Sequence, residues 1–136
     1  MNRLIVDTGF LVAFGRASDP IHPKAVSFLR HYSGRLITVA AVIVEASFFL
    51  STRSKQQLLE WIHAGGVAVM DVPVSAYPEL AATIGKYSNR DIDFADAALV
   101  WLAEQSSVRS ILTIDRADFE IYRLKTGKRF DLVSWC

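Results

Sequence analysis

Short apolar runs that alternate with segments of helical spacing are the feature that most constrains how this chain can fold. The runs lie at residues 4–6, 36–39, 67–72 and 110–115, and residues 130–135 are a candidate edge strand. A short run without a polar face is typical of a strand that is buried on both sides. Strands that alternate with helices predict an α/β fold, with a mostly parallel sheet of four to five strands flanked by helices on both faces.

The segments between the runs are predicted to be helical at residues 10–14, 23–32, 40–50, 55–64, 75–87, 93–107 and 116–122. In the helix at 40–50, the spacing predicts that Val44, Phe48 and Phe49 point toward the core. Ser54 is the predicted N-cap of the helix at 55–64, and Asp93 is the predicted N-cap of the helix at 93–107.

Length and composition predict one globular domain, residues 1–136, because hydrophobic residues make up 51% and charged residues 21% of the chain. The formal net charge of +1 argues against binding nucleic acid through bulk positive charge, although a local basic rim is still compatible with it. The single cysteine, Cys136, excludes a disulfide within the chain and favours a cytoplasmic location. No apolar run approaches the ~18 residues of a membrane span, and no signal peptide is expected.

Four acidic residues stand out by their context. Asp7 and Asp115 each close an apolar strand, whereas Glu45 and Asp96 each interrupt an apolar helical stretch. Ligands of open α/β sheets bind at the carboxyl ends of the strands, so we expect these acids to meet there. Burying an unpaired carboxylate costs several kcal/mol, and a bound divalent cation with oxygen ligands offsets that cost.

Each acid also has a purely structural interpretation when it is taken alone. Asp7 could be a turn residue, and Asp115 could cap the helix that follows it. Glu45 could lie on the exposed side of its helix, and Asp96 could interact with the helix dipole. The metal-site hypothesis explains all four positions at once, whereas the structural interpretations require four coincidences at one edge of the sheet.

With these acids in place, the chain resembles a PIN domain, specifically the VapC-type toxin ribonuclease of bacterial and archaeal toxin–antitoxin pairs. The resemblance rests on Leu4-Ile5-Val6-Asp7-Thr8-Gly9, on Glu45, on Asp93-Phe94-Ala95-Asp96-Ala97, and on the segment 111–119 with Asp115-Arg116-Ala117-Asp118-Phe119. It extends over essentially the whole chain.

The resemblance implies a metal-dependent endoribonuclease that hydrolyses RNA phosphodiester bonds. The acidic quartet that would hold one or two Mg²⁺ or Mn²⁺ ions is Asp7, Glu45, Asp96 and Asp115. Supporting positions around that quartet are Thr8, Thr113, Asp93 and Asp118. Candidate RNA contacts are Arg90 and Arg116, with a basic stretch formed by Arg123, Lys125, Lys128 and Arg129 as an extension or as a merely solvated face.

The resemblance also implies partners. A homodimer and a cognate antitoxin are expected, and the helices between the second and third strands match an insertion that often shapes both contacts. An antitoxin is expected to lay an apolar helix across a groove and to offer a basic residue to the acidic site.

Other classes of function are less consistent with the sequence. Asp7-Thr8-Gly9 also occurs in aspartic proteases, but those are all-β proteins and this chain has no second copy of the triplet. Glycine motifs that bind nucleotides are absent, and the three histidines lack metal-ligand spacing. A non-catalytic PIN-like module that binds RNA or protein is the remaining alternative, although such a module has no evident need for four clustered acids.

Overall fold

The computed structural model describes residues 2–136, so Met1 of the predicted domain lies outside the described residues. Five parallel strands form one sheet in the order β3-β2-β1-β4-β5. The strands are β1 (Arg3–Val6), β2 (Arg35–Val39), β3 (Ala68–Met70), β4 (Ser110–Leu112) and β5 (Asp131–Leu132). The predicted parallel sheet is therefore confirmed, and the candidate edge strand near the end of the chain is real.

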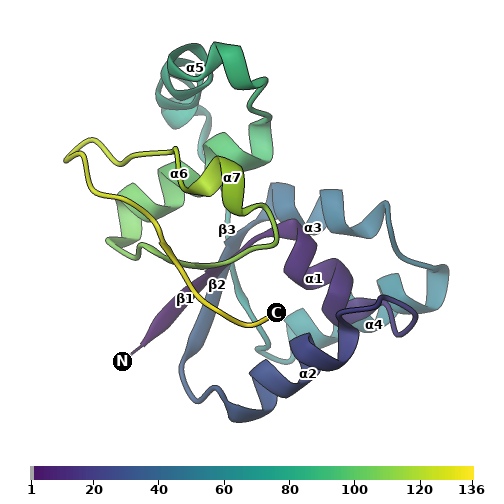
Figure 1. The fold of residues 1–136 in the computed structure, drawn as a ribbon. Helices are drawn as coiled ribbons and strands as arrows, with labels where there is room; N and C mark the ends of the chain where they lie inside the picture. The colour runs from purple at the N-terminus through teal and green to yellow at the C-terminus, as the bar shows by residue number, and fades with distance from the viewer. Residues whose placement is uncertain (1) are drawn as a thin grey trace.

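Helices connect the strands and cover both faces of the sheet. They are α1 (Thr8–Gly15), α2 (His22–His31), α3 (Ala40–Ser47), α4 (Thr52–His63), α5 (Tyr77–Lys86), α6 (Phe94–Ser106) and α7 (Arg116–Phe119), with short 3-10 turns at Val74–Ala76 and Ser88–Arg90. Figure 1 shows α1, α2 and α4 gathered on one side of the sheet, with α6 and α7 on the other. Within residues 2–136, none of the helices combines the length and apolar composition that a membrane span needs.

The centre of the sheet is its most buried part. Ile5 and Val6 of β1, and Ile111 and Leu112 of β4, are completely buried, because helices cover both faces of these strands. Val6 lies opposite Leu112 in the register, and the Asp7 backbone N–H extends the ladder with a 3.0 Å hydrogen bond to the Leu112 carbonyl oxygen. The two strands therefore end side by side.

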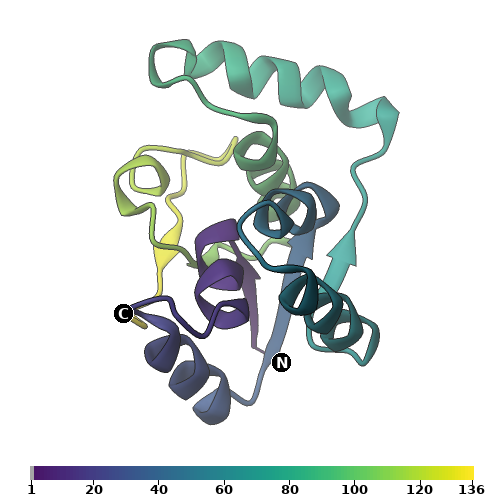
Figure 2. The same cartoon turned by 90° about the vertical axis from the view of Figure 1, so that its right-hand side faces the viewer.

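The order of the strands creates a crevice at that point. From β1 the chain proceeds to β2 and β3 on one side, and then crosses back to β4 and β5 on the other. Figure 2 shows α1, which follows β1, on the near side of the sheet. Such a reversal opens a space above the carboxyl ends of the two central strands, where ligands of α/β proteins bind.

Two local predictions are wrong, both around α3 and α4. The helix α3 ends at Ser47, and Val44, Phe48 and Phe49 are exposed at 56%, 75% and 55% rather than buried. Only one side of α3 packs inward, and the two phenylalanines fall in the turn that follows the helix. The N-cap of α4 is Ser51 instead of Ser54, because the Ser51 side chain accepts a hydrogen bond from the Ser54 backbone N–H.

Candidate active site

A cleft of about 440 Å³ lies at the carboxyl ends of the central strands. All four predicted quartet acids line it, namely Asp7, Glu45, Asp96 and Asp115. The supporting residues Thr8, Asp93 and Asp118 line it as well. The structure therefore brings together acids from four separate segments of the chain, as their positions in the sequence predict.

Asp7 is the innermost acid and is only 6% exposed. Its Oδ1 accepts a 2.7 Å hydrogen bond from the Thr8 backbone N–H, and its Oδ2 accepts a 2.8 Å bond from the Thr113 hydroxyl. Thr113 Oγ1 in turn accepts a 2.9 Å bond from the Asp115 N–H, and the Trp135 indole N–H donates to the Thr113 carbonyl oxygen. Thr113 thus links the two strand ends and fixes the orientation of the Asp7 carboxylate.

Asp96 lies in the first turn of α6, at the helix N-terminus. Asp93 caps the helix, as predicted, because its Oδ1 accepts a 2.8 Å hydrogen bond from the Asp96 N–H. The Asp96 Oδ2 accepts a 2.9 Å hydrogen bond from the Tyr122 hydroxyl, which comes from a segment 26 residues away. Residues Ala97 to Ala103 of the helix are all buried, so the Asp96 carboxylate is held on a rigid element.

Asp115 combines both interpretations that its sequence position allows. It lines the cleft, and it also caps α7 by accepting a hydrogen bond of 3.4 Å from the Asp118 N–H. Asp118 is in turn paired with Arg90, whose Nε and Nη2 lie 3.1 and 2.9 Å from Asp118 Oδ1. The Arg90 guanidinium therefore neutralises an acid of the site in this structure, and Arg90 is not among the lining residues of the cleft.

Burial and mutual repulsion make these acids difficult to ionise. Burial raises the pKa of Asp7 to about 6, although the hydrogen bonds from Thr113 and Thr8 oppose this effect. Burial, and after it the charge of Asp7, raises the pKa of Asp96 to about 8. Burial also raises the pKa of Asp115. The cleft thus gathers negative charge that favours either protons or a cation.

The donor atoms fit a hard divalent cation. Carboxylate oxygens of Asp96, Asp115 and Asp118 lie within 4.8 Å of one another, and Asp7 belongs to the same cleft. Among residues 2–136, Thr8 Oγ1 is a buried polar side-chain atom at this cleft with no hydrogen-bond partner. An all-oxygen ligand set of this kind suits Mg²⁺ or Mn²⁺. Asp118, which the resemblance gives only a supporting role, is thus one of the three acids whose oxygens lie close enough to share one ion.

Glu45 differs from the other quartet members. It lines the cleft from α3 and is partly buried, but within residues 2–136 no hydrogen bond fixes its side chain. Its charge nevertheless acts on the centre of the site, because it contributes to the raised pKa of Asp7 after the effects of burial and of the two hydrogen bonds.

Of the two predicted RNA contacts, Arg90 lies beside the cleft through its pair with Asp118, but the arginine that lines the cleft, Arg16, is not one that sequence reasoning favoured. Arg16 lines the cleft, and its Nη1 donates a 3.3 Å hydrogen bond to the Phe49 carbonyl oxygen. The predicted Arg116 is exposed at the start of α7 and outside the lining. In the basic stretch, Arg123 bonds to backbone carbonyl oxygens and Lys125 lies 3.6 Å from Glu79.

Sequence reasoning missed three site residues for an identifiable reason. Arg16 and Tyr122 reach the acids only through tertiary folding, and nothing in their local sequence marks them. Asp91 lies two residues before the predicted cap Asp93, and in the structure it adopts a left-handed conformation (φ 52°) that aspartate tolerates.

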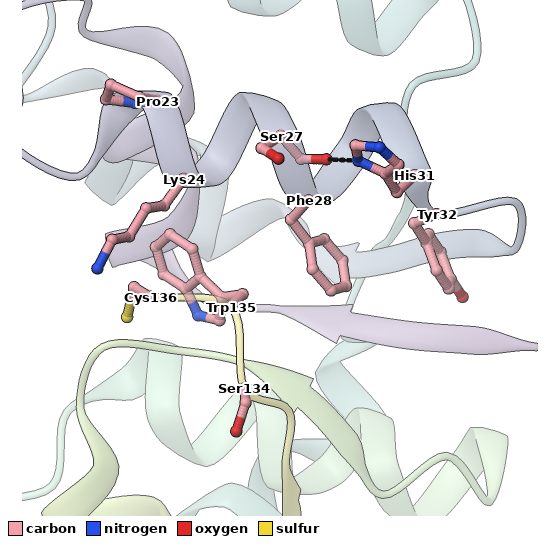
Figure 3. Close-up of a pocket in the computed structure, with 9 residues that line it drawn as sticks. All are labelled: Pro23, Lys24, Ser27, Phe28, His31, Tyr32, Ser134, Trp135 and Cys136. Carbon is pink, nitrogen blue, oxygen red and sulfur yellow. Dashed lines mark hydrogen bonds between the residues drawn. The ribbon is translucent and has the colours of Figure 1, made fainter.

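A second hollow, of about 690 Å³, lies between α2 and the C-terminal segment. Figure 3 shows its lining, in which Phe28, Tyr32 and Trp135 supply aromatic surface, with Lys24 and His31 nearby. No acidic side chain belongs to this lining, so the hollow offers no metal ligands comparable with those of the acidic cleft.

Comparison with known proteins identifies the family. The family model for the PIN domain matches residues 4–124. The chain belongs to the PIN-domain family. It is 28% identical to Ribonuclease VapC26 of Mycobacterium tuberculosis over 134 residues, which cover 96% of this chain and 99% of that protein.

Its fold is also similar to the crystal structure of VapC20 from Mycobacterium tuberculosis, which is described as a toxin that cleaves the sarcin–ricin loop. The TM-score is 0.75 at 19% sequence identity, with 82% of this chain and 89% of that chain covered. The shared architecture confirms the predicted PIN-like fold.

Proposed function

We propose that this protein is a metal-dependent endoribonuclease and the toxin of a type II toxin–antitoxin pair. The observation that carries the proposal is the convergence of Asp7, Glu45, Asp96 and Asp115 on one cleft in a PIN-domain fold. Similarity to Ribonuclease VapC26 along nearly the full length of both chains supports the same activity.

In this proposal the quartet, together with Asp118, holds one or two Mg²⁺ or Mn²⁺ ions. A divalent ion supplies Lewis-acid polarisation of the phosphodiester and neutralises charge that develops during hydrolysis. The protein supplies orientation: Thr113 and the Thr8 N–H hold Asp7, and the Asp93 cap holds the start of α6. Because these contacts exist before substrate binds, the carboxylates need little reorganisation.

The rim of the cleft fits single-stranded or looped RNA. Phe49 and Ile114 line the cleft and are 55% and 52% exposed, so they offer apolar surface to unstacked bases. Arg16 lies on the same rim and can contact a phosphate, whereas Arg90 would first have to leave Asp118. Arg116, at the start of α7, is the further phosphate contact in this proposal.

Exposed apolar residues indicate where protein partners bind. Val44, Phe48, Phe49 and Leu59 are all more than half exposed on or beside α3 and α4, and we propose that the antitoxin covers this surface. A homodimer is the second proposed assembly, with Met70 on the exposed edge strand β3 as part of its surface. Both assemblies, and the RNA substrate, fit a cytoplasmic location.

Cleavage of a mixed, labelled RNA pool by the purified protein tests the activity. We expect cutting with Mg²⁺ or Mn²⁺, none with EDTA, and a loss of about a thousandfold or more in Asp7→Asn and Asp96→Asn. Asp71→Asn is the matched control, because Asp71 is exposed and lies outside the cleft. Undiminished cutting by Asp7→Asn would refute the assignment, and RNA binding without cutting would favour the binding-module alternative.

A further inference from the structure

The hydroxyl of Tyr122 reaches the acidic cleft from the segment that follows α7. It donates a 2.9 Å hydrogen bond to Asp96 Oδ2, and within residues 2–136 no other hydrogen bond engages the Asp96 carboxylate. We infer that Tyr122 is a positioning residue, which holds Oδ2 of Asp96 and leaves Oδ1 for the cation. This inference rests on the proposed metal-dependent function.

The ring of Tyr122 is locked in place by aromatic neighbours. It is completely buried, and it makes edge-to-face contacts with Tyr87 and Phe119 at centroid distances of 5.0 and 5.1 Å. Phe119 also packs edge-to-face on Phe130, at 5.3 Å. A ring confined on all sides cannot swing, so its hydroxyl marks a fixed point from which the Asp96 carboxylate is oriented.

The backbone around Tyr122 is fixed as well. The Arg123 Nη1 donates hydrogen bonds of 2.6, 2.8 and 3.0 Å to the carbonyl oxygens of Glu120, Ile121 and Tyr122. The Tyr122 N–H donates to the Asp118 carbonyl oxygen at 3.1 Å, and the Arg123 N–H donates to the Tyr87 hydroxyl at 2.9 Å. Arg123, for which the sequence allowed either an RNA contact or a merely solvated position, thus rigidifies the support of the site.

A donor at this position has a physical purpose. Carboxylate oxygens of Asp96, Asp115 and Asp118 crowd within 4.8 Å, and repulsion would turn an unrestrained Asp96 side chain away from its neighbours. The Tyr122 hydroxyl places a positive hydrogen against one oxygen and so favours a single orientation. Partners that orient a metal-ligating carboxylate typically account for about 10–100-fold in metal affinity.

Mn²⁺ binding, measured by isothermal titration calorimetry and by the Mn²⁺ electron paramagnetic resonance spectrum, tests the inference. Tyr122→Phe keeps the ring and removes only the hydroxyl, so we expect Mn²⁺ affinity to fall about tenfold. Tyr32→Phe is the matched control: it also loses one tyrosine hydroxyl, but that hydroxyl donates to the Arg35 carbonyl oxygen, and Tyr32 lies outside the acidic cleft. Its Mn²⁺ affinity should stay within about twofold of the wild type.

A double-variant cycle separates positioning from general loosening. If Tyr122 acts through Asp96, Tyr122→Phe should change Mn²⁺ affinity by less than about twofold once Asp96→Asn is present. An equal effect in both backgrounds, or an unchanged affinity in Tyr122→Phe alone, would overturn the role of Tyr122 while the metal site stands. Absence of Mn²⁺ binding by the wild-type protein would overturn the proposed metal site and this role with it.

Discussion

Helices α3 and α6 are both mostly apolar in sequence, and each contributes one acid to the cleft. They nevertheless lie in different environments. Helix α6 carries Asp96, and its residues from Ala97 to Ala103 are all buried between the sheet and α5. Helix α3 carries Glu45, but only Val42 and Ala46 of that helix are buried.

The difference shows that an apolar helical pattern can arise from two causes. In α6 the pattern reflects a helix surrounded by the core. Around α3 it reflects one side that packs inward and another that is exposed, with Phe48 at 75% exposure. Exposed apolar surface of this extent is typical of an interaction site.

The two acids differ in the same way. Asp96 is fixed by a cap and by the Tyr122 hydroxyl, and its pKa is raised by burial and then by the charge of Asp7. No hydrogen bond within residues 2–136 fixes the Glu45 side chain. The site therefore has a rigid side on α6 and an adjustable side on α3.

The largest expected contrast is in stability. Leu99→Ala in α6 should lower the free energy of unfolding by about 3 kcal/mol, because Leu99 is completely buried and the substitution leaves a cavity. Phe48→Ala beside α3 should change it by less than about 0.5 kcal/mol, because this side chain is mostly exposed. Urea denaturation of both variants measures the contrast, and a comparable loss in Phe48→Ala would contradict the exposed placement of this residue.

The next contrast is in the pH dependence of the stability of the metal-free protein. The pKa values of Asp7 and Asp96 rise from 3.8 to about 6 and about 8 in the folded protein. Between pH 4 and 8 the folded state therefore binds more protons than the unfolded state, and the stability of the metal-free protein falls as pH rises. Thermal unfolding in EDTA from pH 5 to 8.5 measures this fall.

Substitution of the acid on each helix shows which carboxylate causes the fall in stability with rising pH. Asp96→Asn should flatten the decline above pH 6, because the substituted side chain does not ionise, while Glu45→Gln should leave the decline nearly as in the wild type. Added Mn²⁺ should oppose the decline, since binding requires ionised carboxylates and strengthens as they lose protons. A wild-type stability that rises from pH 5 to 8.5 in EDTA would contradict the raised pKa values.

The sheet and the acidic quartet could be predicted because both leave local marks in the sequence. Apolar runs such as residues 4–6 identify the buried strands, and an acid that follows a run, such as Asp7, lies at the carboxyl edge of a parallel sheet. Asp93 could be predicted as a cap because it precedes a long apolar helix.

The rest depends on tertiary packing, which local patterns do not contain. Tyr122 contacts Asp96 only because the segment after α7 folds back over α6, and Arg16 lines the cleft only because α1 ends beside Phe49. The outward direction of Phe48 likewise depends on where α3 ends. A periodicity argument gives the spacing of apolar residues but does not decide whether anything covers them.

The smallest expected effect on stability concerns the N-cap of α4. This helix has one buried residue, Leu58, so its stability depends on local interactions more than that of α6 does. Ser51→Ala should lower the free energy of unfolding by about 1 kcal/mol, since the Ser54 N–H loses its 3.1 Å partner. Ser54→Ala should cost less than about 0.5 kcal/mol, because the Ser54 side chain caps no backbone group in this structure. Thermal unfolding of the two variants measures which serine caps α4. A larger loss of stability in Ser54→Ala would agree with the cap that the sequence predicted and would contradict Ser51 as the N-cap.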